Sequence, residues 1–389
     1  MATEPAPEAV ASTSQPSVPL TNGVKKVYKP RYIDIGINLT DPVFTGLYHG
    51  TQRHPNDLSS VLQRAKEVGC EKLIVTGSDL HESRKAIQLA KDHPGTIYAT
   101  IGVHPCNCTQ FTSSPSPSII LDELRTLALE AKSSSHAVAF GEIGLDYDRL
   151  SLCPKETQLQ YFASQLLLAI EIQLPLFLHS RAAHSDFVRI LREFEERLPR
   201  RGVVHSFTGT REEMWELVGM GWDIGVNGCS MKTQENCEVV REVPLGRLQV
   251  ETDGPWCEMR GSHKSTDYLA AMGVGIKAKP KIEPKLIMNG NGVGGESGDG
   301  VEKIESAESG EQGGEAGGEE DFNGELKEWK SVKKEKWTES SMIKGRNEPC
   351  MIGHVAWAIA GIKGVSVKEV ADAAWANSVR MFGVGEDGK

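Results

Sequence analysis

Short apolar runs alternate with longer amphipathic stretches along most of the chain. The apolar runs have the length and β-branched character of strands, and they fall at 32–39, 72–77, 97–103, 137–145, 174–180, 202–207, 222–228 and 248–253. Between them, apolar residues recur at helical spacing, which predicts helices at 57–69, 81–92, 155–172, 185–198 and 211–220. Nearly continuous apolar strands that alternate with helices are typical of a parallel sheet covered by helices.

The number of strand–helix units favours one α/β architecture. Eight such units in succession predict a closed TIM-type (β/α)8 barrel. An open, doubly wound sheet is the alternative, but no Gly-x-Gly-x-x-Gly motif follows the first strand. Two further helices, at 351–364 and 367–383, are expected to return to the barrel and cover it.

Two segments differ in composition from the alternating pattern. Residues 1–30 are rich in Ala, Pro, Ser and Thr, and residues 288–325 are dominated by Gly, Glu, Ser and Asp. Such segments cannot bury enough apolar surface to order themselves. We therefore expect a disordered N-terminal tail at 1–30 and one barrel domain at 31–383. A disordered insertion at 288–325, after the eighth strand, interrupts that domain and is given no catalytic role.

Charge and cysteine content exclude several classes of protein. The net charge is −10, so a nucleic acid would have to be bound by a local patch or a metal rather than by the whole surface. The eight cysteines include no Cys-x-x-Cys pair, which favours free thiols in a reducing compartment. No apolar run is long enough to span a membrane. These features predict a soluble intracellular protein of the cytoplasm or nucleus, and the basic stretch 327–337 is a weak import signal.

Metal-type ligands stand at the ends of several predicted strands. The strands in question are the third, fourth, fifth, sixth and eighth, which end on His104, Glu142, His179, His205 and Asp253. In a barrel, the carboxyl ends of the strands meet at one mouth, where active sites lie. Alone, each residue has an ordinary explanation as a surface or hydrogen-bonded side chain. Imidazoles and carboxylates that recur at the same place on five strands predict a divalent-metal site.

Several motifs, in this order, resemble one known family. They are YIDIGINLTDPVFTG, IGVHP, GEIGLDYDR, ETQLQYFASQLLLAIEIQLPLFLHSR, HSFTG, ETDGPW and RNEP. The chain resembles the TatD-related deoxyribonucleases, most of all their eukaryotic TatD-domain-containing branch, over about 31–275 and 326–383. The resemblance implies a metal-dependent hydrolase with a TIM barrel that cuts DNA.

The resemblance also implies roles for individual residues. Metal ligands would be Glu142, His179, His205 and Asp253. Catalytic residues would be Asp253, Glu142 and His104, with Asp253 as a ligand or as the base that takes the proton of water. Contacts to the substrate phosphate would come from His104, Arg149 and Arg181, with Lys264 as a further candidate. Arg181 and the 346–348 segment would support the mouth.

The first strand departs from the wider family. Many members carry Asp-x-His-x-His there, whereas this chain has Gly36 and Asn38 at the two histidine positions. We expect up to two divalent ions per chain, the second held weakly by oxygens of Asn38, Asp253 and Glu142. Oxygen donors favour Mg²⁺ or Mn²⁺ over Zn²⁺.

The sequence therefore predicts a metal-dependent deoxyribonuclease, expected to be a 3′–5′ exonuclease, with DNA as substrate and no obligate protein partner. One alternative is a metal-dependent amidohydrolase that acts on a small-molecule amide or ester. No predicted strand ends on a lysine that could be carboxylated, which disfavours that alternative. A second alternative is a non-catalytic interaction protein, and the complete ligand set argues against it.

Overall fold

Eight parallel strands form the central sheet of the computed structural model, which describes residues 28–198, 202–274 and 326–385. In the order in which they lie side by side they are β1 (Tyr32–Ile37), β4 (Cys70–Val75), β5 (Ile97–Ile101), β6 (Ala137–Asp146), β7 (Leu176–Arg181), β8 (Val203–Val204), β9 (Asp223–Val226) and β10 (Leu248–Val250). Each strand pairs in parallel with the next. All eight predicted strands are confirmed, and they lie side by side in the order of the chain.

The residues after β10 join the last strand to the first. The Asp253 amide donates to the Gly36 carbonyl at 2.8 Å, and the Asn38 amide donates to the Gly254 carbonyl at 2.8 Å. These bonds nearly close the sheet into the predicted (β/α)8 barrel. The alternative of an open, doubly wound sheet is therefore wrong.

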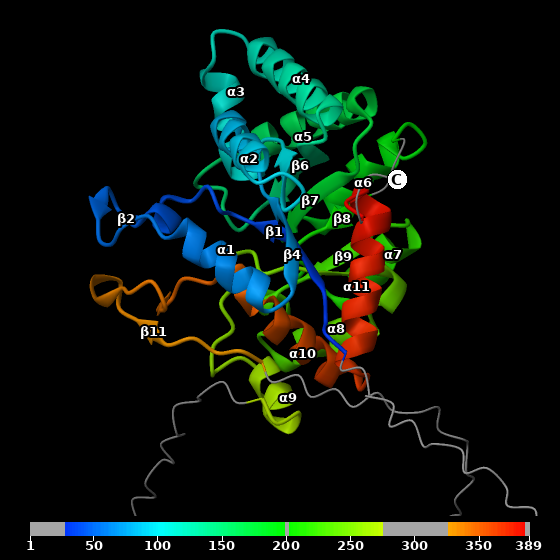
Figure 1. The fold of residues 1–389 in the computed structure, drawn as a ribbon. Coiled ribbons are helices and arrows are strands. Elements are labelled where there is room, and N and C mark those ends of the chain that lie inside the picture. The colour runs from blue at the N-terminus through cyan, green and yellow to red at the C-terminus, as the bar shows by residue number, and fades with distance from the viewer. Residues whose placement is uncertain (1–27, 199–201, 275–325, 386–389) are drawn as a thin grey trace, which may run out of the picture. The chain divides into compact units, whose positions relative to one another are not determined.

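Helices surround the strands (Figure 1). They are α1 (Leu58–Glu67), α2 (Leu80–Asp92), α3 (Thr109–Ser113), α4 (Pro117–Ser133), α5 (Lys155–Ile172), α6 (His184–Phe194), α7 (Arg211–Gly219), α8 (Gln234–Glu242), α9 (Ser265–Ala271), α10 (Ile352–Lys363) and α11 (Val367–Phe382). Every predicted helix is present. The helices α3, α4, α8 and α9 were not predicted, although α4 buries Leu124, Ala128 and Ala131 at helical spacing.

Further short strands lie in the segments that connect the barrel elements. A hairpin of β2 (Leu47–Tyr48) and β3 (Thr51–Gln52) lies between β1 and α1. The pair β11 (Ser331–Val332) and β12 (Met342–Ile343) lies in the chain before α10. Residues 1–27 of the predicted tail and the whole predicted insertion at 288–325 lie outside the described residues.

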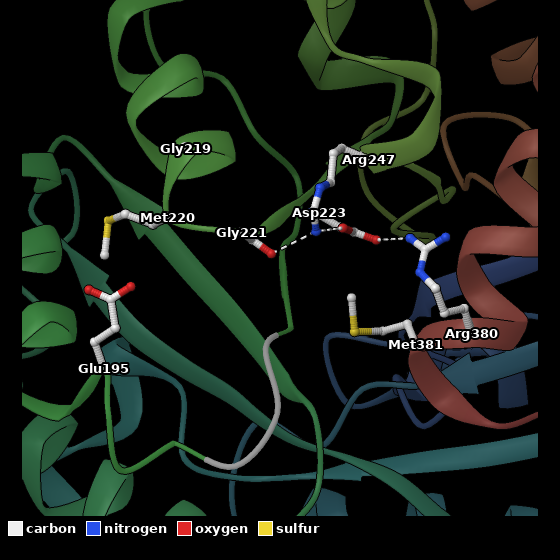
Figure 2. Close-up of a pocket in the computed structure, with 8 residues that line it drawn as sticks. All are labelled: Glu195, Gly219, Met220, Gly221, Asp223, Arg247, Arg380 and Met381. Carbon is white, nitrogen blue, oxygen red and sulfur yellow. Dashed lines mark hydrogen bonds and ion pairs between the residues drawn. The ribbon is translucent and has the colours of Figure 1, made fainter.

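The amino-terminal end of the barrel holds a polar network around Asp223, a fully buried residue at the start of β9. Its carboxylate accepts hydrogen bonds from Arg247 (3.1 Å), Gln249 (2.9 Å) and Arg380 (3.4 Å). A cavity of about 560 Å³ opens beside this network and is lined by Glu195, Gly219, Met220, Gly221, Asp223, Arg247, Arg380 and Met381 (Figure 2). The network ties β9 and β10 to α11 at the end opposite the strand carboxyl termini.

The helices of the described chain are short or carry many charged residues relative to a membrane span. None of them alone has both the length and the apolar composition to cross a bilayer. The segments Pro349–Lys363 and Val367–Phe382, which meet at a bend of 115°, meet the length and composition criteria only as a pair.

Candidate active site

Three neighbouring strands bring an acidic and two imidazole side chains together, although Glu142 lies within β6 and not at its predicted end, because β6 continues to Asp146. Glu142 lies on β6, His179 lies on β7, and His205 directly follows β8. His205 Nε2 lies 2.6 Å from Glu142 Oε1, and His179 Nδ1 lies 2.8 Å from the same oxygen. The candidate donor atoms of these residues all lie within 4.8 Å of one another, so the structure brings together three of the four predicted metal ligands.

The Asp146 carboxylate contacts the ring nitrogen of His179 that faces away from Glu142. His179 Nε2 lies at hydrogen-bond distance, 3.2 Å, from Asp146 Oδ2. If Nε2 carries the proton of the neutral ring, Nδ1 has only a lone pair. That lone pair faces Glu142, and Nδ1 makes no hydrogen bond despite its closeness to Oε1.

His205 also has a carboxylate on each side, but its hydrogen bond is the 2.6 Å contact of Nε2 with Glu142, and its outer carboxylate is more distant. Its Nδ1 lies 3.5 Å from Glu251 Oε2, and neither atom has a hydrogen bond elsewhere. The second oxygen of Glu251 accepts from the Ser206 amide at 2.5 Å and from the Asn227 side chain at 3.2 Å, which fixes the carboxylate. With the proton of His205 on Nδ1, its Nε2 lone pair also faces Glu142.

Two imidazole lone pairs and a carboxylate oxygen therefore point at one place. Such a cluster is repulsive unless it holds a cation or takes up protons. A histidine whose outer nitrogen is bonded to a carboxylate, with its inner nitrogen free, is the common arrangement of metal-bound histidine. The donor set of Glu142, His179 and His205 therefore fits a divalent cation.

His104 lies in the same cluster but differs in its hydrogen bonds. Its Nδ1 accepts from the Cys106 amide at 3.1 Å, and its Nε2 lies 3.4 Å from Glu142 Oε1. A neutral imidazole that accepts through Nδ1 must carry its proton on Nε2. His104 therefore presents a donor rather than a lone pair, which suits a contact to phosphate better than a metal bond.

Asp253 lies beside the cluster, and its carboxylate is not part of the compact donor groups among the described residues. Its Oδ1 accepts from Asn38 Nδ2 at 3.0 Å, and its Oδ2 accepts from the Cys257 thiol at 3.2 Å. Asn38 Nδ2 also donates to the Gly254 carbonyl at 3.2 Å, so the amide nitrogen of Asn38 faces Asp253. Asn38 thus orients this carboxylate.

The ionisation of the cluster follows from burial and from mutual contacts. Burial opposes the charge of Glu142, but the imidazoles of His205, His104 and His179 outweigh it and hold the pKa of Glu142 well below its ordinary value. Burial lowers the pKa of His104 to about 4, against the pull of Glu142. Burial raises the pKa of Asp253 to about 7, with His205 acting in the opposite direction.

Burial likewise opposes the protonation of His179 and His205, but the neighbouring carboxylates prevail. The hydrogen bond to Asp146 and the close contact with Glu142 raise the pKa of His179. Glu142 and Glu251 raise the pKa of His205 well above its ordinary value. The pocket therefore attracts positive charge at the point where the imidazoles meet Glu142.

The predicted phosphate contacts differ in their surroundings. Arg181, at the end of β7, donates to the Ser206 carbonyl at 3.4 Å and keeps a buried Nε without a partner. Arg149 is exposed in the turn after β6. Lys264 is engaged with Asp267 at 2.9 Å. Arg181 thus keeps a buried donor free, and the exposed Arg149 side chain makes no hydrogen bond or ion pair among the described residues.

A cavity of about 800 Å³ opens beside Arg181 and extends between α7 and α8. At the ends of β7 and β8 its walls include Ser180, Arg181, Phe207 and Thr208. The residues of the donor cluster do not line this cavity, so it adjoins Arg181 rather than forming the site itself.

Asp146 and Glu251 are the site residues that sequence reasoning missed. Asp146 is four positions after Glu142 on the same strand, and the two-residue period of a strand places both on one face. Glu251 stands two residues before Asp253, but it faces His205 and not a shared ligand position. The first could have been found from strand periodicity, whereas the second depends on contacts across the barrel.

Comparisons with known proteins agree on one family. The sequence profile described as TatD related DNase matches residues 33–287. "Deoxyribonuclease Tat-D" of Schizosaccharomyces pombe is 40% identical over 353 residues, which cover 90% of this chain and 96% of that protein. "3'-5' ssDNA/RNA exonuclease TatD" of Erwinia tasmaniensis is 37% identical over 226 residues, 57% of this chain and 79% of that protein.

A solved structure shares the fold. A Saccharomyces cerevisiae protein described as an uncharacterized amidohydrolase superposes with a TM-score of 0.71 at 32% identity, covering 91% of this chain and 100% of that chain.

Proposed function

The chain belongs to the TatD related DNase family of metal-dependent hydrolases, and we propose from that premise that it is a deoxyribonuclease that removes nucleotides from the 3′ end of a DNA strand. The observation that carries this proposal is the pair of imidazoles, each backed by a carboxylate, that face one oxygen of Glu142. The name of the Erwinia relative supports the 3′ to 5′ direction and a single-stranded substrate. The barrel domain at 31–383 carries the activity, and the segment 288–325 is not needed for it.

Glu142, His179 and His205 would hold a divalent cation, and Mg²⁺ or Mn²⁺ is the proposed ion. When bound, such a cation supplies positive charge for the phosphate and acidifies water. Asp146 and Glu251 keep the ring protons on the outer nitrogens of His179 and His205. Both imidazoles therefore offer their lone pairs to the ion.

Other side chains of the mouth would handle the substrate and the proton. His104 donates its Nε2 proton to a phosphate oxygen, and the free Nε of Arg181 approaches a second oxygen. Asp253 accepts the proton of the attacking water through a carboxylate that Asn38 and Cys257 hold in place. The water oxygen bonds to phosphorus as the bond to the leaving oxygen breaks.

Two ions of unequal affinity are proposed. One is held tightly by Glu142, His179 and His205. A second would be held weakly, because Gly36 has no ligand atom and the nitrogen of Asn38 faces Asp253. It would depend on oxygens of the substrate phosphate.

The test is the digestion of oligonucleotides labelled at the 5′ end, single-stranded and duplex, with Mg²⁺ or Mn²⁺ and with products resolved by length. A 3′–5′ exonuclease gives a ladder that shortens one nucleotide at a time. Internal fragments at early times would show that the protein is an endonuclease and not an exonuclease. Hydrolysis of small amides without any cleavage of DNA would contradict the proposal.

A further inference from the structure

One basic segment is not used by the proposed mechanism. Residues 327–344 contain six lysines, although the chain carries a net charge of −10. Lys330, Lys333, Lys336 and Lys344 are exposed, and none of them has an ion-pair partner in the described parts of the chain. Lys29, Lys66 and Lys91 are also exposed and unpaired among the described residues, but they lie on separate parts of the chain, whereas these four lie in one segment.

The segment 327–344 packs against the barrel. The Trp337 ring stacks on His54, with 5.7 Å between centroids and 16° between planes. Trp337 Nε1 donates to Asp57 Oδ2 at 3.0 Å, and Lys334 Nζ lies 4.7 Å above the Tyr48 ring. The lysines therefore sit on a platform formed by the β2–β3 hairpin and the start of α1.

This platform lies on the mouth side of the barrel. The hairpin belongs to the connection that leaves the carboxyl end of β1, and Figure 1 shows β2 and β11 on the same side of the molecule. The chain continues from β12 to Asn347, whose amide donates to the Pro255 carbonyl at 3.0 Å and whose side chain donates to the Thr252 carbonyl at 2.8 Å. The same segment thus contacts the turn that carries Asp253.

A buried ion-pair network holds the segment in place. The Arg346 guanidinium makes bonds to Asp57 at 2.9 and 2.7 Å and to Glu348 at 2.8 Å. Arg64 of α1 donates to Glu348 at 2.8 Å. These side chains are at most 3% exposed, so the base of the platform is rigid and the lysines are its solvent-facing part.

We propose that Lys330, Lys333, Lys334, Lys336 and Lys344, here called the lysine surface, bind the sugar–phosphate backbone of the nucleic acid away from the bond that is cut. The inference rests on the proposed nuclease function. Unpaired lysines on a rigid base provide sequence-independent phosphate contacts. An acidic protein needs such a local surface, because the rest of its field repels a polyanion.

The test compares two triple variants with equal net charge. The first is Lys330→Gln, Lys333→Gln and Lys336→Gln. The matched control is Lys29→Gln, Lys66→Gln and Lys91→Gln, three exposed lysines at the amino-terminal end of the barrel that likewise have no ion pair among the described residues. Cleavage rates are measured on a single strand of about 20 nucleotides and on a dinucleotide, at several salt concentrations.

We expect the first variant to raise KM for the long strand about tenfold, while its KM for the dinucleotide changes less than twofold. The slope of log(1/KM) against log salt should fall in magnitude by about 2, since three phosphate contacts on a single strand contribute roughly 0.7 each. The control should match the wild type on both substrates.

Three outcomes would overturn the assignment of this surface. They are an unchanged KM for the long strand, an equal effect in the control variant, and an equal effect on the dinucleotide. A wild-type protein that cleaves neither substrate would instead refute the nuclease function itself, so the two failures are distinguishable. Circular dichroism and thermal unfolding of each variant confirm that it is folded.

Discussion

The side chains of Asp146 and Glu251 decide which nitrogen of each imidazole faces Glu142. His179 points its Nε2 at Asp146 and His205 points its Nδ1 at Glu251, so different nitrogens of the two rings turn inward. A carboxylate can only accept a hydrogen bond from a neutral imidazole, and it therefore selects one tautomer. The candidate metal site is thus formed by Glu142 and the two histidines together with the carboxylates that orient those histidines.

Replacing Glu251 by Gln should weaken metal binding. The amide of Gln can donate to Nδ1 of His205, which moves the ring proton to Nε2 and removes the lone pair that faces Glu142. We expect a loss of about 10- to 100-fold in metal affinity. Calorimetric titration of the metal-free protein with Mn²⁺ measures it, and Glu123→Gln, on the exposed surface of α4, is the control. Wild-type affinity in Glu251→Gln would show that the outer carboxylate does not set the tautomer.

His104 and His205 should separate into a substrate contact and a metal ligand. His205→Ala removes a lone pair from the donor cluster, so both the bound metal and the activity should be lost. His104→Ala removes only a proton donor, so the metal should stay while the cleavage rate falls at least about 100-fold, in the range of a lost catalytic donor. Metal analysis by mass spectrometry and initial rates are the two readouts. Equal metal loss in both variants would make His104 a ligand.

At the scale of the element, closure of the barrel depends on a buried acid on β1. Asp34 is fully buried and accepts from the Thr252 amide at 2.9 Å and from the Thr252 hydroxyl at 2.5 Å. Burial raises the pKa of Asp34 to about 8, against the effect of these bonds. The closing contact between β1 and the segment after β10 is therefore linked to pH.

Asp34→Asn should flatten the pH dependence of stability. Because the folded pKa is raised above the unfolded one, native Asp34 keeps its proton between about pH 4 and 8 while the unfolded chain loses it. The free energy of unfolding of the wild type should accordingly fall as pH rises through this window, by at most about 1.4 kcal/mol per pH unit from this residue. Urea unfolding of both proteins from pH 5 to 8 gives the slopes. Parallel slopes would mean that Asp34 is already ionised in the folded state.

The Asp223 network should contribute to the stability of the fold but not to the rate of cleavage. Asp223→Ala removes the acceptor of the buried Gln249 amide and one acceptor from each of Arg247 and Arg380 (Figure 2). This network lies at the end of the barrel away from the site. We expect the free energy of unfolding to fall by about 2 kcal/mol, with kcat/KM unchanged. Asp267→Ala, which breaks only the exposed pair with Lys264, should cost less than about 1 kcal/mol. A large loss of activity in Asp223→Ala would contradict this division between the two ends.

The strands were predictable because both faces of each are buried. All ten residues of β6 are buried, and short, β-branched apolar runs between turn signals favour strands over buried helices. Glu142, His179, His205 and His104 could be brought together from the sequence, because parallel strands place their carboxyl ends at one mouth. The choice of tautomer, the role of Glu251 and the inward position of Asn38's amide nitrogen could not be predicted. They depend on contacts between residues as far apart as 38 and 253.

At the scale of the whole molecule, a net charge of −10 opposes the approach of DNA to the site. A polyanionic substrate is repelled at long range, so positive charge has to be concentrated where the phosphate is cut and where the strand is held. The donor cluster with its cation, the free nitrogen of Arg181 and the lysine surface would provide it. This arrangement predicts cleavage that weakens steeply as salt is added.

The most direct test is the rate of cleavage of a single strand by protein freed of metal with a chelator and then titrated with Mn²⁺. The account predicts no cleavage before the titration. In the wild type, tight uptake of one ion should come first, and activity should then rise in the millimolar range as the second ion binds with the substrate. His205→Ala should stay inactive throughout. Full cleavage by the metal-free protein, or wild-type cleavage by His205→Ala, would contradict a metal centre at Glu142, His179 and His205.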